Sequence, residues 1–326
     1  MAFELIVGLA PDAAALSLAV AVDLAVGDPV YRGHPVRIMG WTLQRIEAAL
    51  WAVGANGYGG GVALFLVLAA LWTGGVSLLV LAGGGASPWL AWTLHVYLLY
   101  SLIAMGDLLH HGWRIERALR QDDLEKARRA VSQLVGRDTD RMDHAACRRA
   151  AVESLSENLT DGFVSPLCWY IAAGLPGVVL FKVVSTMDSM VGYKTERYIR
   201  FGWCGARIDD LMNLVPARLT FVLLSLTAAL LPQCSGRKAW RVGLDQHAVL
   251  PGPNSGWSEA ATAGALERRL IGPIRMHGQL VTDVWLGDPT DPPLGTAGDY
   301  RRASALVAIG GLVAALIGWL LLLRWV

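Results

Sequence analysis

Long apolar stretches alternate with polar segments along the chain. The clearest apolar stretches are about 20 residues long and almost free of charge, which is the length that a helix needs to cross a bilayer. Two others are weaker, because one contains Asp12 and Asp23 and the other is interrupted by a Gly-Leu-Pro-Gly break at 174–177. The sequence therefore predicts an all-α, multi-pass membrane protein with about 4–6 spans. The spans are expected near residues 5–27, 62–83, 88–109, 165–186, 212–232 and 303–323.

The charges of the connecting segments predict which side of the membrane each one faces. The connection at 84–87 is short and uncharged, whereas 110–164 carries several Arg and Lys residues, as cytoplasmic loops do. The segment 187–211 is also basic, so a single full span at 165–186 would place it outside the cell. A re-entrant hairpin at the Gly-Leu-Pro-Gly break returns the chain to the cytoplasm and is the interpretation favoured here. The span count and the remaining topology stay open.

The two long polar segments are expected to fold differently. In 110–164 the apolar positions recur at three- and four-residue steps, which predicts a helical cytoplasmic region. The segment 233–302 is rich in Gly and Pro and predicts a loop region with one short helix near 257–270. No internal repeat is visible, and we expect a single integral membrane domain over residues 1–326.

Composition agrees with a membrane protein and excludes several classes of function. Hydrophobic residues make up 54% of the chain and charged residues only 17%, whereas soluble domains usually carry about a quarter. A net charge of +1 offers no basic field for nucleic acid. The four cysteines lie far apart without a CxxC pair, which argues against a disulfide framework and a zinc knuckle.

The first cluster of candidate residues ends the first apolar stretch. Asp23 and Asp28 precede a Gly-Pro turn and His34, and together they could bind a cation or position a substrate. The alternative is a helix end with capping acids and a turn, which the spacing alone favours.

The second cluster is an acidic row. Glu153, Glu157 and Asp161 follow one another at helical spacing, where like charges repel unless a cation offsets them. Arg149 supplies part of that charge, and a hard cation such as Mg²⁺ could supply more. A solvated acidic face is an equally good interpretation of the spacing.

The third cluster mixes acids with bases beside an apolar stretch. Its acids and amide are oxygen donors of the kind that Mg²⁺ prefers, and its Lys and Arg residues could hold phosphate oxygens. Flanking positive charge at a membrane surface would explain the basic residues but not the acids. The members are Asp188, Lys194, Arg197, Arg207, Asp209, Asp210, Asn213 and Arg218.

A fourth feature is the start of an Ala-rich helix at Asn254. The free amides there could bind an anion, although a plain helix cap is equally consistent with the sequence. There is no Walker A loop, GxSxG or HExxH, so a nucleotide would be bound by an unfamiliar arrangement.

Taken together and in this order, these motifs resemble the membrane-bound adenosylcobinamide-phosphate synthase family of cobalamin biosynthesis. The resemblance spans nearly the whole chain, and it departs at Ser258, where the family has Pro after the Trp. The matching strings are Asp23-x3-Gly27-Asp28-Pro29, His34-Pro35-Val36-x3-Gly40, Glu153-Ser154, Glu157-Asn158, Asp161-Gly162, Ser165-Pro166-Leu167, Asp188-x3-Gly192-Tyr193-Lys194, Arg197-Tyr198, Phe201-Gly202, Ala206-Arg207-x-Asp209-Asp210, Pro216-Ala217-Arg218, Pro253-Asn254-Ser255-Gly256-Trp257 and Ala263-Gly264-Ala265-Leu266.

The resemblance implies an activity and a location. The family joins a carboxylate of adenosylcobyric acid to (R)-1-aminopropan-2-ol, or to its O-phosphate, with consumption of ATP. Family members are bacterial proteins of the cell inner membrane, which implies lipid contact, an active site facing the cytoplasm, and a place beside other membrane enzymes of the pathway. The corrinoid is expected to dock on the aqueous loops.

Residue roles follow from the chemistry of this reaction, because the resemblance supplies none. For Mg²⁺ we expect Asp188, Asp209, Asp210 and Glu157 as ligands. For phosphate and nucleotide groups we expect Lys194, Arg197, Arg207, Arg218 and Asn254. For the base that takes a proton from the ammonium group we expect His34, Glu153 or Asp161.

Two other classes of function compete with this one. Asp209-Asp210-x-x-Asn213 is similar to aspartate-rich diphosphate sites of membrane prenyl or phosphoalcohol transferases, but those need a second acidic motif, and 303–323 carries none. A nonenzymatic sensor or transporter would place polar groups at mid-span, whereas here they gather at span ends and loops.

Overall fold

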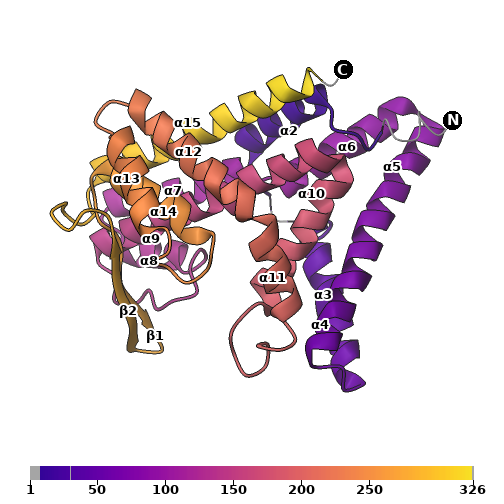
Figure 1. Cartoon of the computed structure of the whole chain (residues 1–326), viewed down its shortest axis with the longest axis horizontal. Helices are drawn as coiled ribbons and strands as arrows, with labels where there is room; N and C mark the ends of the chain where they lie inside the picture. Colours follow the sequence, from indigo (N-terminus) through magenta and orange to yellow (C-terminus); the bar gives the residue numbers. More distant parts are fainter. Residues whose placement is uncertain (1–7, 30, 325–326) are drawn as a thin grey trace. The chain divides into compact units, whose positions relative to one another are not determined.

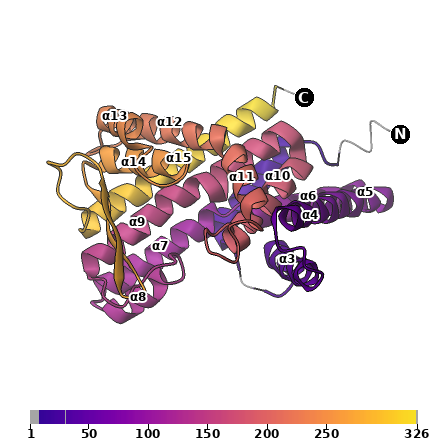
Figure 2. The ribbon, with the colours of Figure 1, turned by 60° about the horizontal axis from the view of Figure 1, so that its bottom comes forward.

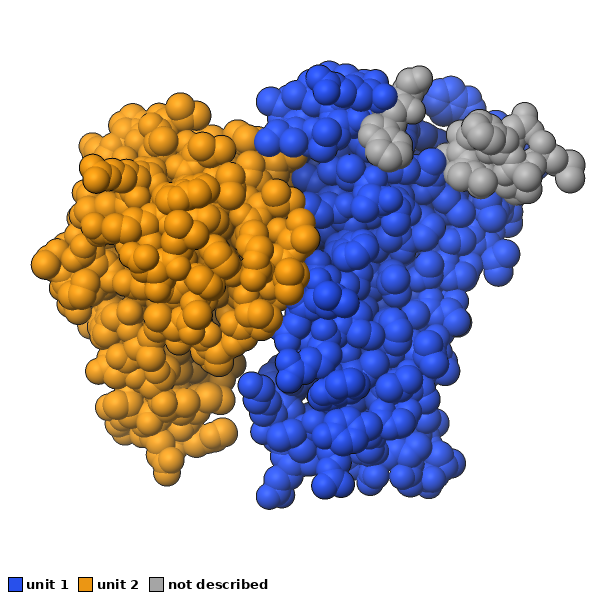
Figure 3. All heavy atoms as spheres, viewed as in Figure 1, with its two compact units in different colours: residues 1–104, 165–213, 315–326 blue, residues 105–164, 214–314 orange. Residues whose placement is uncertain are grey.

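The computed structural model describes residues 8–29 and 31–324 of the chain. These residues are mainly helical, and their contacts divide them into two compact units (Figures 1 and 3). Unit 1 comprises Met1–Ala104, Ser165–Asn213 and Ala315–Val326, and unit 2 comprises Met105–Val164 and Leu214–Ala314. The predicted all-α, multi-pass membrane fold is confirmed, with one small hairpin added to it.

The described part of the chain holds four helices that are long and apolar enough to cross a membrane. A fifth candidate is a pair of helices bent by 44° at Asn213, and Ala13–Val26 is a shorter apolar helix within the predicted first span. All of the other predicted spans overlap one of these candidates. The four are Tyr58–Ala86, Pro88–Arg120, His144–Val191 and Ala297–Leu322, and the bent pair is Trp203–Met212 with Leu214–Leu230.

Unit 1 is built from helices around an apolar core. Met39, Leu43, Leu64 and Leu68 pack there against residues from the second half of α10 and against Phe201. The helices are α2 (Ala13–Val26), α3 (Pro35–Ala52), α4 (Tyr58–Ala69), the π-helical η1 (Ala70–Gly74), α5 (Gly75–Ala86), α6 (Pro88–Leu102), α10 (Ser165–Val191), α11 (Trp203–Met212) and the end of α15 (Ala297–Leu322). In the α4–η1–α5 helix, only 22% of the most apolar 18-residue stretch is buried inside the protein. Most of its apolar surface is therefore exposed, as a helix that faces lipid requires.

The predicted break at 174–177 is confirmed inside α10. Ala173 and Gly174 leave the helical region, and Gly174 has a φ of 64°, which favours glycine. A Cβ on Gly177 would lie 2.4 Å from the carbonyl oxygen of Trp169, eight residues earlier. In a straight helix these positions are roughly 12 Å apart, so the chain bends sharply at this point. The re-entrant hairpin stays a prediction.

Unit 2 packs its helices closely because glycines line their contacts. α13 (Gly236–Gln246), α14 (Ser255–Leu266) and α12 (Leu214–Leu230) lie side by side, as Figure 2 shows for the first two. A Cβ on Gly243 would lie 2.3 Å from the ring of Phe221 in α12, so only glycine permits this approach. The other elements are α7 (Met105–Arg120), α8 (Leu124–Val131), α9 (His144–Leu159), the π-helical η2 (Thr160–Val164) and most of α15. The predicted helical character of 110–164 is confirmed.

The segment 233–302 differs from the prediction of a loop with one short helix. It contains α13 and α14, followed by an antiparallel hairpin of β1 (Leu270–Met276) and β2 (Gln279–Leu286) with a bulge between Ile274 and Arg275. Its glycines at 236, 243, 256 and 264 lie at close helix contacts, Gly272 and Pro273 belong to β1, and most of the other glycines and prolines lie in the turns and connecting loops. α14 is almost wholly buried, which explains its Ala-rich sequence.

Candidate active site

One group of acids lies in unit 1, where α10 meets α11. Asp188 is in the last turn of α10, and α11 packs beside it because Gly205 leaves room for Met187. Gly192 follows Asp188 closely, and a Cβ there would fall 2.1 Å from the Asp188 carboxylate. The space that the Asp188 carboxylate occupies is therefore available only because residue 192 is glycine.

The end of α11 completes this group. Asp209 accepts a hydrogen bond from Asn213 Nδ2 at 2.9 Å, and Asn213 Oδ1 accepts one from Ser165 at 2.5 Å. Asp188 and Asp210 lie close enough to Asp209 for their charges to repel. Three predicted acids are thus brought together, and we call Asp188, Asp209 and Asp210 the unit 1 acid group.

The predicted basic residues of unit 1 differ in their surroundings. Lys194 is exposed, and both it and Arg207 attract Asp210, with Arg207 Nη1 3.6 Å from the carboxylate. Arg197 instead contacts Glu47, which sequence reasoning did not single out, at 3.0 Å and lies over the ring of Trp51. Lys194 and Arg207 are therefore the cations placed beside the acid group.

His34 is buried at the start of α3. Its Nε2 lies 2.7 Å from Asp28, at a distance typical of an ion pair but without hydrogen-bond alignment. Its ring also packs edge-on against Tyr31. The structure thus unites two members of the first sequence cluster, His34 and Asp28.

A second group of acids lies in unit 2. Glu153 and Glu157 of α9, Asp161 of η2 and Glu259 of α14 are close enough to interact electrostatically. We call these four residues the unit 2 acid group. Glu153 accepts a hydrogen bond from Arg137 Nη2 at 2.5 Å, and the two side chains are only 15% and 8% exposed.

Glu259 is the member that sequence reasoning missed. It is 2% exposed, and its Oε2 has no hydrogen-bond partner among the described residues. Burial and the charges of Glu157, Glu153 and Asp161 raise the pKa of Glu259 well above its usual range. The signal that could have found it is a glutamate in an otherwise Ala-rich helix, because a glutamate is rarely buried unless it has a partner.

Arg218 and Asn254, two predicted phosphate-binding residues, meet at the start of α14. Arg218 Nη1 lies 3.4 Å from Asn254 Oδ1, and the guanidinium is 5.0 Å from the ring centre of Trp257. Trp257 also stacks on His247 with ring centres 3.9 Å apart. Asn254 stands at the N-cap position without making a side-chain cap bond, so its amide faces Arg218 instead.

Unit 2 also contains a polar cavity of about 450 Å³ between the loop before α9 and the hairpin. Four guanidinium groups line it, and two of them belong to Arg137 and Arg149, which also interact with Glu153. Sequence reasoning missed this cavity because its walls come from segments more than 120 residues apart. The charged lining residues are Arg137, Arg141, Arg149, Arg275, Asp138, Asp140 and Asp143.

Comparison with known proteins identifies the chain. The model of the family described as "CobD/Cbib protein" matches residues 16–307. The chain belongs to the CobD/CbiB family. The family resemblance of the sequence motifs is thereby confirmed.

Curated relatives of this CobD/CbiB member cover most of its length. "Cobalamin biosynthesis protein CbiB" of Salmonella typhimurium is 38% identical over 275 residues, which is 83% of this chain and 86% of the relative. "Cobalamin biosynthesis protein CobD" of Geobacter metallireducens is 42% identical over 287 residues, or 86% and 87%. The protein of the same name from a Sinorhizobium species is 40% identical over 284 residues, or 84% and 87%. No solved structure matches the fold.

The predicted magnesium ligands of the CobD/CbiB member fall in different units. Asp188, Asp209 and Asp210 belong to unit 1 and Glu157 to unit 2, and among the described residues no group of three His, Cys, Asp or Glu side chains is arranged to hold a metal ion. Mg²⁺ is usually held by one or two carboxylates together with substrate phosphates and water. The crowded carboxylates of the unit 1 acid group fit that mode, because a cation would relieve their repulsion.

Proposed function

We propose that this protein acts in cobalamin biosynthesis as an ATP-dependent acid–amine ligase. It joins a carboxylate of adenosylcobyric acid to (R)-1-aminopropan-2-ol or to the O-phosphate of that amine. The observation that carries the proposal is the family match over residues 16–307, with relatives that are named cobalamin biosynthesis proteins. The two acid groups with their neighbouring cations support it, because the reaction needs both kinds of charge.

The nucleotide belongs, in this proposal, to unit 1. A carboxylate is a poor electrophile, so ATP must convert it to an acyl phosphate or an acyl adenylate before an amine can attack. Mg²⁺ bound with ATP would neutralise charge on the phosphates. Asp188, Asp209 and Asp210 supply oxygen ligands for it, and Lys194 and Arg207 hold phosphate oxygens and the charge that develops on them.

The amine belongs to unit 2. The ammonium group must lose a proton before its nitrogen can attack the activated carbonyl carbon, so a base is needed nearby. The candidates from the sequence are His34, Glu153 and Asp161, of which Glu153 is engaged by Arg137. Glu259 joins them, because it is close to Glu153 and Asp161 and its Oε2 has no hydrogen-bond partner among the described residues. Burial first, and then the neighbouring carboxylates, raise the pKa of Glu259 and favour its protonated form, so a cation such as the ammonium group must lie beside it before it can act as a carboxylate base.

The apolar helices support a place in the bacterial inner membrane. We propose that the active site faces the cytoplasm, where ATP and the corrinoid are available, and that other membrane enzymes of the pathway are neighbours. The corrinoid is large and polar, so it is expected to dock on the aqueous loops, with the exposed Trp203 or the half-buried Tyr198 packing against its faces. Trp257, the third aromatic candidate, is buried and stacked on His247.

Purified protein in lipid nanodiscs tests this function. With adenosylcobyric acid, the amine, ATP and Mg²⁺, we expect adenosylcobinamide or its phosphate by mass spectrometry, with one ATP consumed per product. Omission of any one substrate should abolish product. A complete mixture that yields no amide, from protein that is folded by its tryptophan fluorescence, would contradict the proposal.

A further inference from the structure

A chain of hydrogen bonds inside unit 1 ends on one member of the unit 1 acid group. Ser165 Oγ donates to Asn213 Oδ1 at 2.5 Å, and Asn213 Nδ2 donates to Asp209 Oδ2 at 2.9 Å. We propose that Ser165 and Asn213 are positioning residues, which orient the Asp209 carboxylate toward a nucleotide-bound Mg²⁺ without contacting the cation themselves. This inference rests on the proposed function, and it gives a different role to Asn213, whose amide oxygen the sequence suggested as a metal ligand.

The direction of each hydrogen bond follows from the groups involved. An ionised carboxylate can only accept, so the amide of Asn213 turns its NH₂ group toward Asp209 and its oxygen toward Ser165. The hydroxyl of Ser165 is then the donor. Ser165 and Asn213 are 0% and 2% exposed, so the amide oxygen is engaged at a buried position rather than turned toward solvent.

Ser165 directs its hydroxyl away from its own helix. Two other buried hydroxyls in helices, those of Ser101 and Thr220, donate to the backbone carbonyl four residues earlier, as is usual for Ser and Thr within a helix. Ser165 instead donates to a side chain 48 positions away in the sequence. It directly follows the π-helical turn η2, and turns of this kind occur frequently at functional sites.

The break in α10 lets both ends of this helix reach α11. Ser165 begins α10 and Asp188 lies in its last turn, so a straight helix would separate them by about 35 Å. Here Ser165 bonds to Asn213, while Asp188 acts on Asp209, which precedes Asn213 by only about 6 Å of helix. The bend at Gly174 therefore brings the first and the last turn of α10 to the same end of α11.

Backbone contacts hold the end of α11 in place. Trp169, one turn after Ser165, donates from Nε1 to the carbonyl oxygen of Met212 at 3.1 Å. Asn213 follows α11, and its backbone N–H donates to the carbonyl oxygen of Asp209 at 2.9 Å. With the backbone held, rotation of the Asp209 side chain is the freedom that remains, and the bond from Asn213 Nδ2 restricts it. That bond engages Oδ2, and Oδ1 accepts no hydrogen bond from the described residues.

Binding of Mn²⁺ together with a nonhydrolysable ATP analogue tests this role in the full chain in nanodiscs, without corrinoid or amine. Electron paramagnetic resonance measures the bound Mn²⁺ directly and does not depend on turnover. Loss of a residue that orients a metal ligand typically weakens metal binding about 10- to 100-fold. Ser165→Ala, which removes a single oxygen atom, should weaken Mn²⁺ binding about 10-fold. Wild-type affinity in this variant would overturn the proposal.

A double variant shows whether Ser165 acts through Asp209. In Asp209→Asn, the carboxylate that Ser165 helps to orient is gone, while Asp188 and Asp210 remain to hold the cation. Addition of Ser165→Ala to this variant should cause no further loss of Mn²⁺ affinity, because coupled residues are not additive. If Ser165→Ala lowered the affinity by the same factor in both backgrounds, its role would be structural and the proposal would fail.

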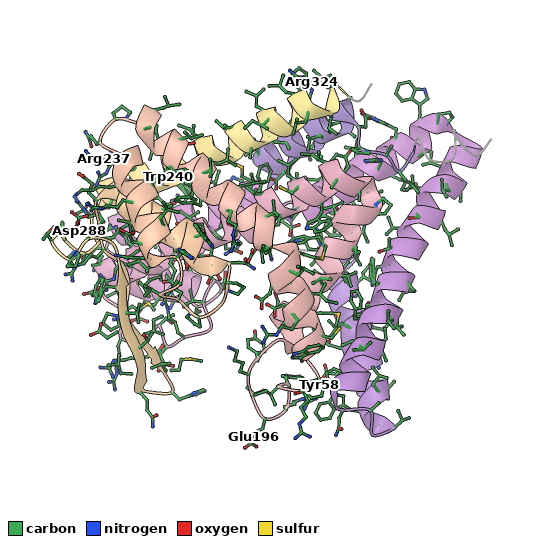
Figure 4. The ribbon with its side chains drawn as sticks, in the orientation of Figure 1. Tyr58, Glu196, Arg237, Trp240, Asp288 and Arg324 are labelled. Atoms are coloured by element: carbon green, nitrogen blue, oxygen red, sulfur yellow. The ribbon has the colours of Figure 1, made fainter. Side chains whose placement is uncertain are left out.

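Two control variants isolate the effect. Ser101→Ala removes another buried hydroxyl of unit 1, one that bonds only within its own helix region. Glu196→Gln removes an exposed negative charge from the loop between α10 and α11, where its side chain points away from both helices (Figure 4). Both should bind Mn²⁺ as the wild type does. Equal losses of affinity in Ser101→Ala and Ser165→Ala would overturn the proposal.

The same measurements separate this inference from the proposed function. Weaker Mn²⁺ binding in Ser165→Ala, in a protein that forms no amide, would retain the positioning role and reject the ligase. Ligation by the wild type with unchanged Mn²⁺ binding in Ser165→Ala would retain the ligase and reject the positioning role. A wild-type protein without saturable Mn²⁺ binding would also reject the positioning role.

Discussion

Replacing Arg137 by Met tests the electrostatics of the unit 2 acid group. The change leaves the buried Glu153 carboxylate without the guanidinium that donates to it, beside Glu157 and Glu259 and with Arg149 as the remaining cation of its surroundings. Removing one partner of a buried ion pair costs about 3–5 kcal/mol, against about 1 kcal/mol or less for an exposed pair. The side chains of Arg137 and Glu153 are only 8% and 15% exposed, and other carboxylates lie near. We therefore expect the free energy of unfolding to fall by an amount toward the upper end of about 3–5 kcal/mol.

Denaturant unfolding in detergent micelles, followed by tryptophan fluorescence, measures this loss. The double variant Arg137→Met with Glu153→Met should recover most of it, because an apolar pair of similar volume often replaces a buried ion pair without loss. A single-variant loss below about 1 kcal/mol, the size found for exposed pairs, would refute the reasoning. So would a double variant as unstable as the sum of the two singles.

Three further outcomes follow from the structure. Gly192→Ala should lower turnover on the order of 10²-fold, because the new Cβ displaces the Asp188 carboxylate, whereas Gly59→Ala, with open space around its Cβ, should leave activity unchanged. Asp209→Asn should lower kcat by about 10²–10³-fold and raise the Mg²⁺ concentration needed for half-maximal rate; a near wild-type rate would remove the unit 1 acid group from the mechanism. For Glu259, the pKa in the folded protein is raised above its unfolded value of ~4.3, so the associated stability is present below about pH 4 and is lost as the pH rises through the folded pKa. As the pH rises above about 5, the denaturant midpoint of Glu259→Gln should therefore increase relative to that of the wild type, and parallel pH profiles of the two proteins would contradict this.

The membrane-spanning helices could be predicted because each is a run of about 20 apolar residues within one continuous segment of the sequence. Tyr58–Ala86 and Ala297–Leu322 contain long runs without charge, and the break in α10 follows from a Gly-Leu-Pro-Gly string. The segment 233–302 was not predictable in the same way. Its helix α13 is short, and the buried face of α13 consists of Ala239, Val242 and Gly243, which carry little hydrophobic signal.

The acid groups were predictable only where they are local in sequence. Glu153, Glu157 and Asp161 share one helical stretch, and Asp209 and Asp210 are adjacent, so spacing alone suggested them. Glu259 joins the same cluster from a segment about 100 residues away, Arg137 joins it from the loop before α9, and no spacing rule connects either of them to α9. Contacts of this kind depend on tertiary packing.

In the proposed reaction, ATP activates the corrinoid carboxylate before the amine attacks. Adenosylcobyric acid labelled with oxygen-18 in its reacting carboxylate tests this most directly, because amide formation must remove one carboxylate oxygen. We expect this oxygen-18 atom in inorganic phosphate, if the intermediate is an acyl phosphate, or in AMP, if it is an acyl adenylate. Amide formed with the label released only into water would show that ATP does not activate the carboxylate.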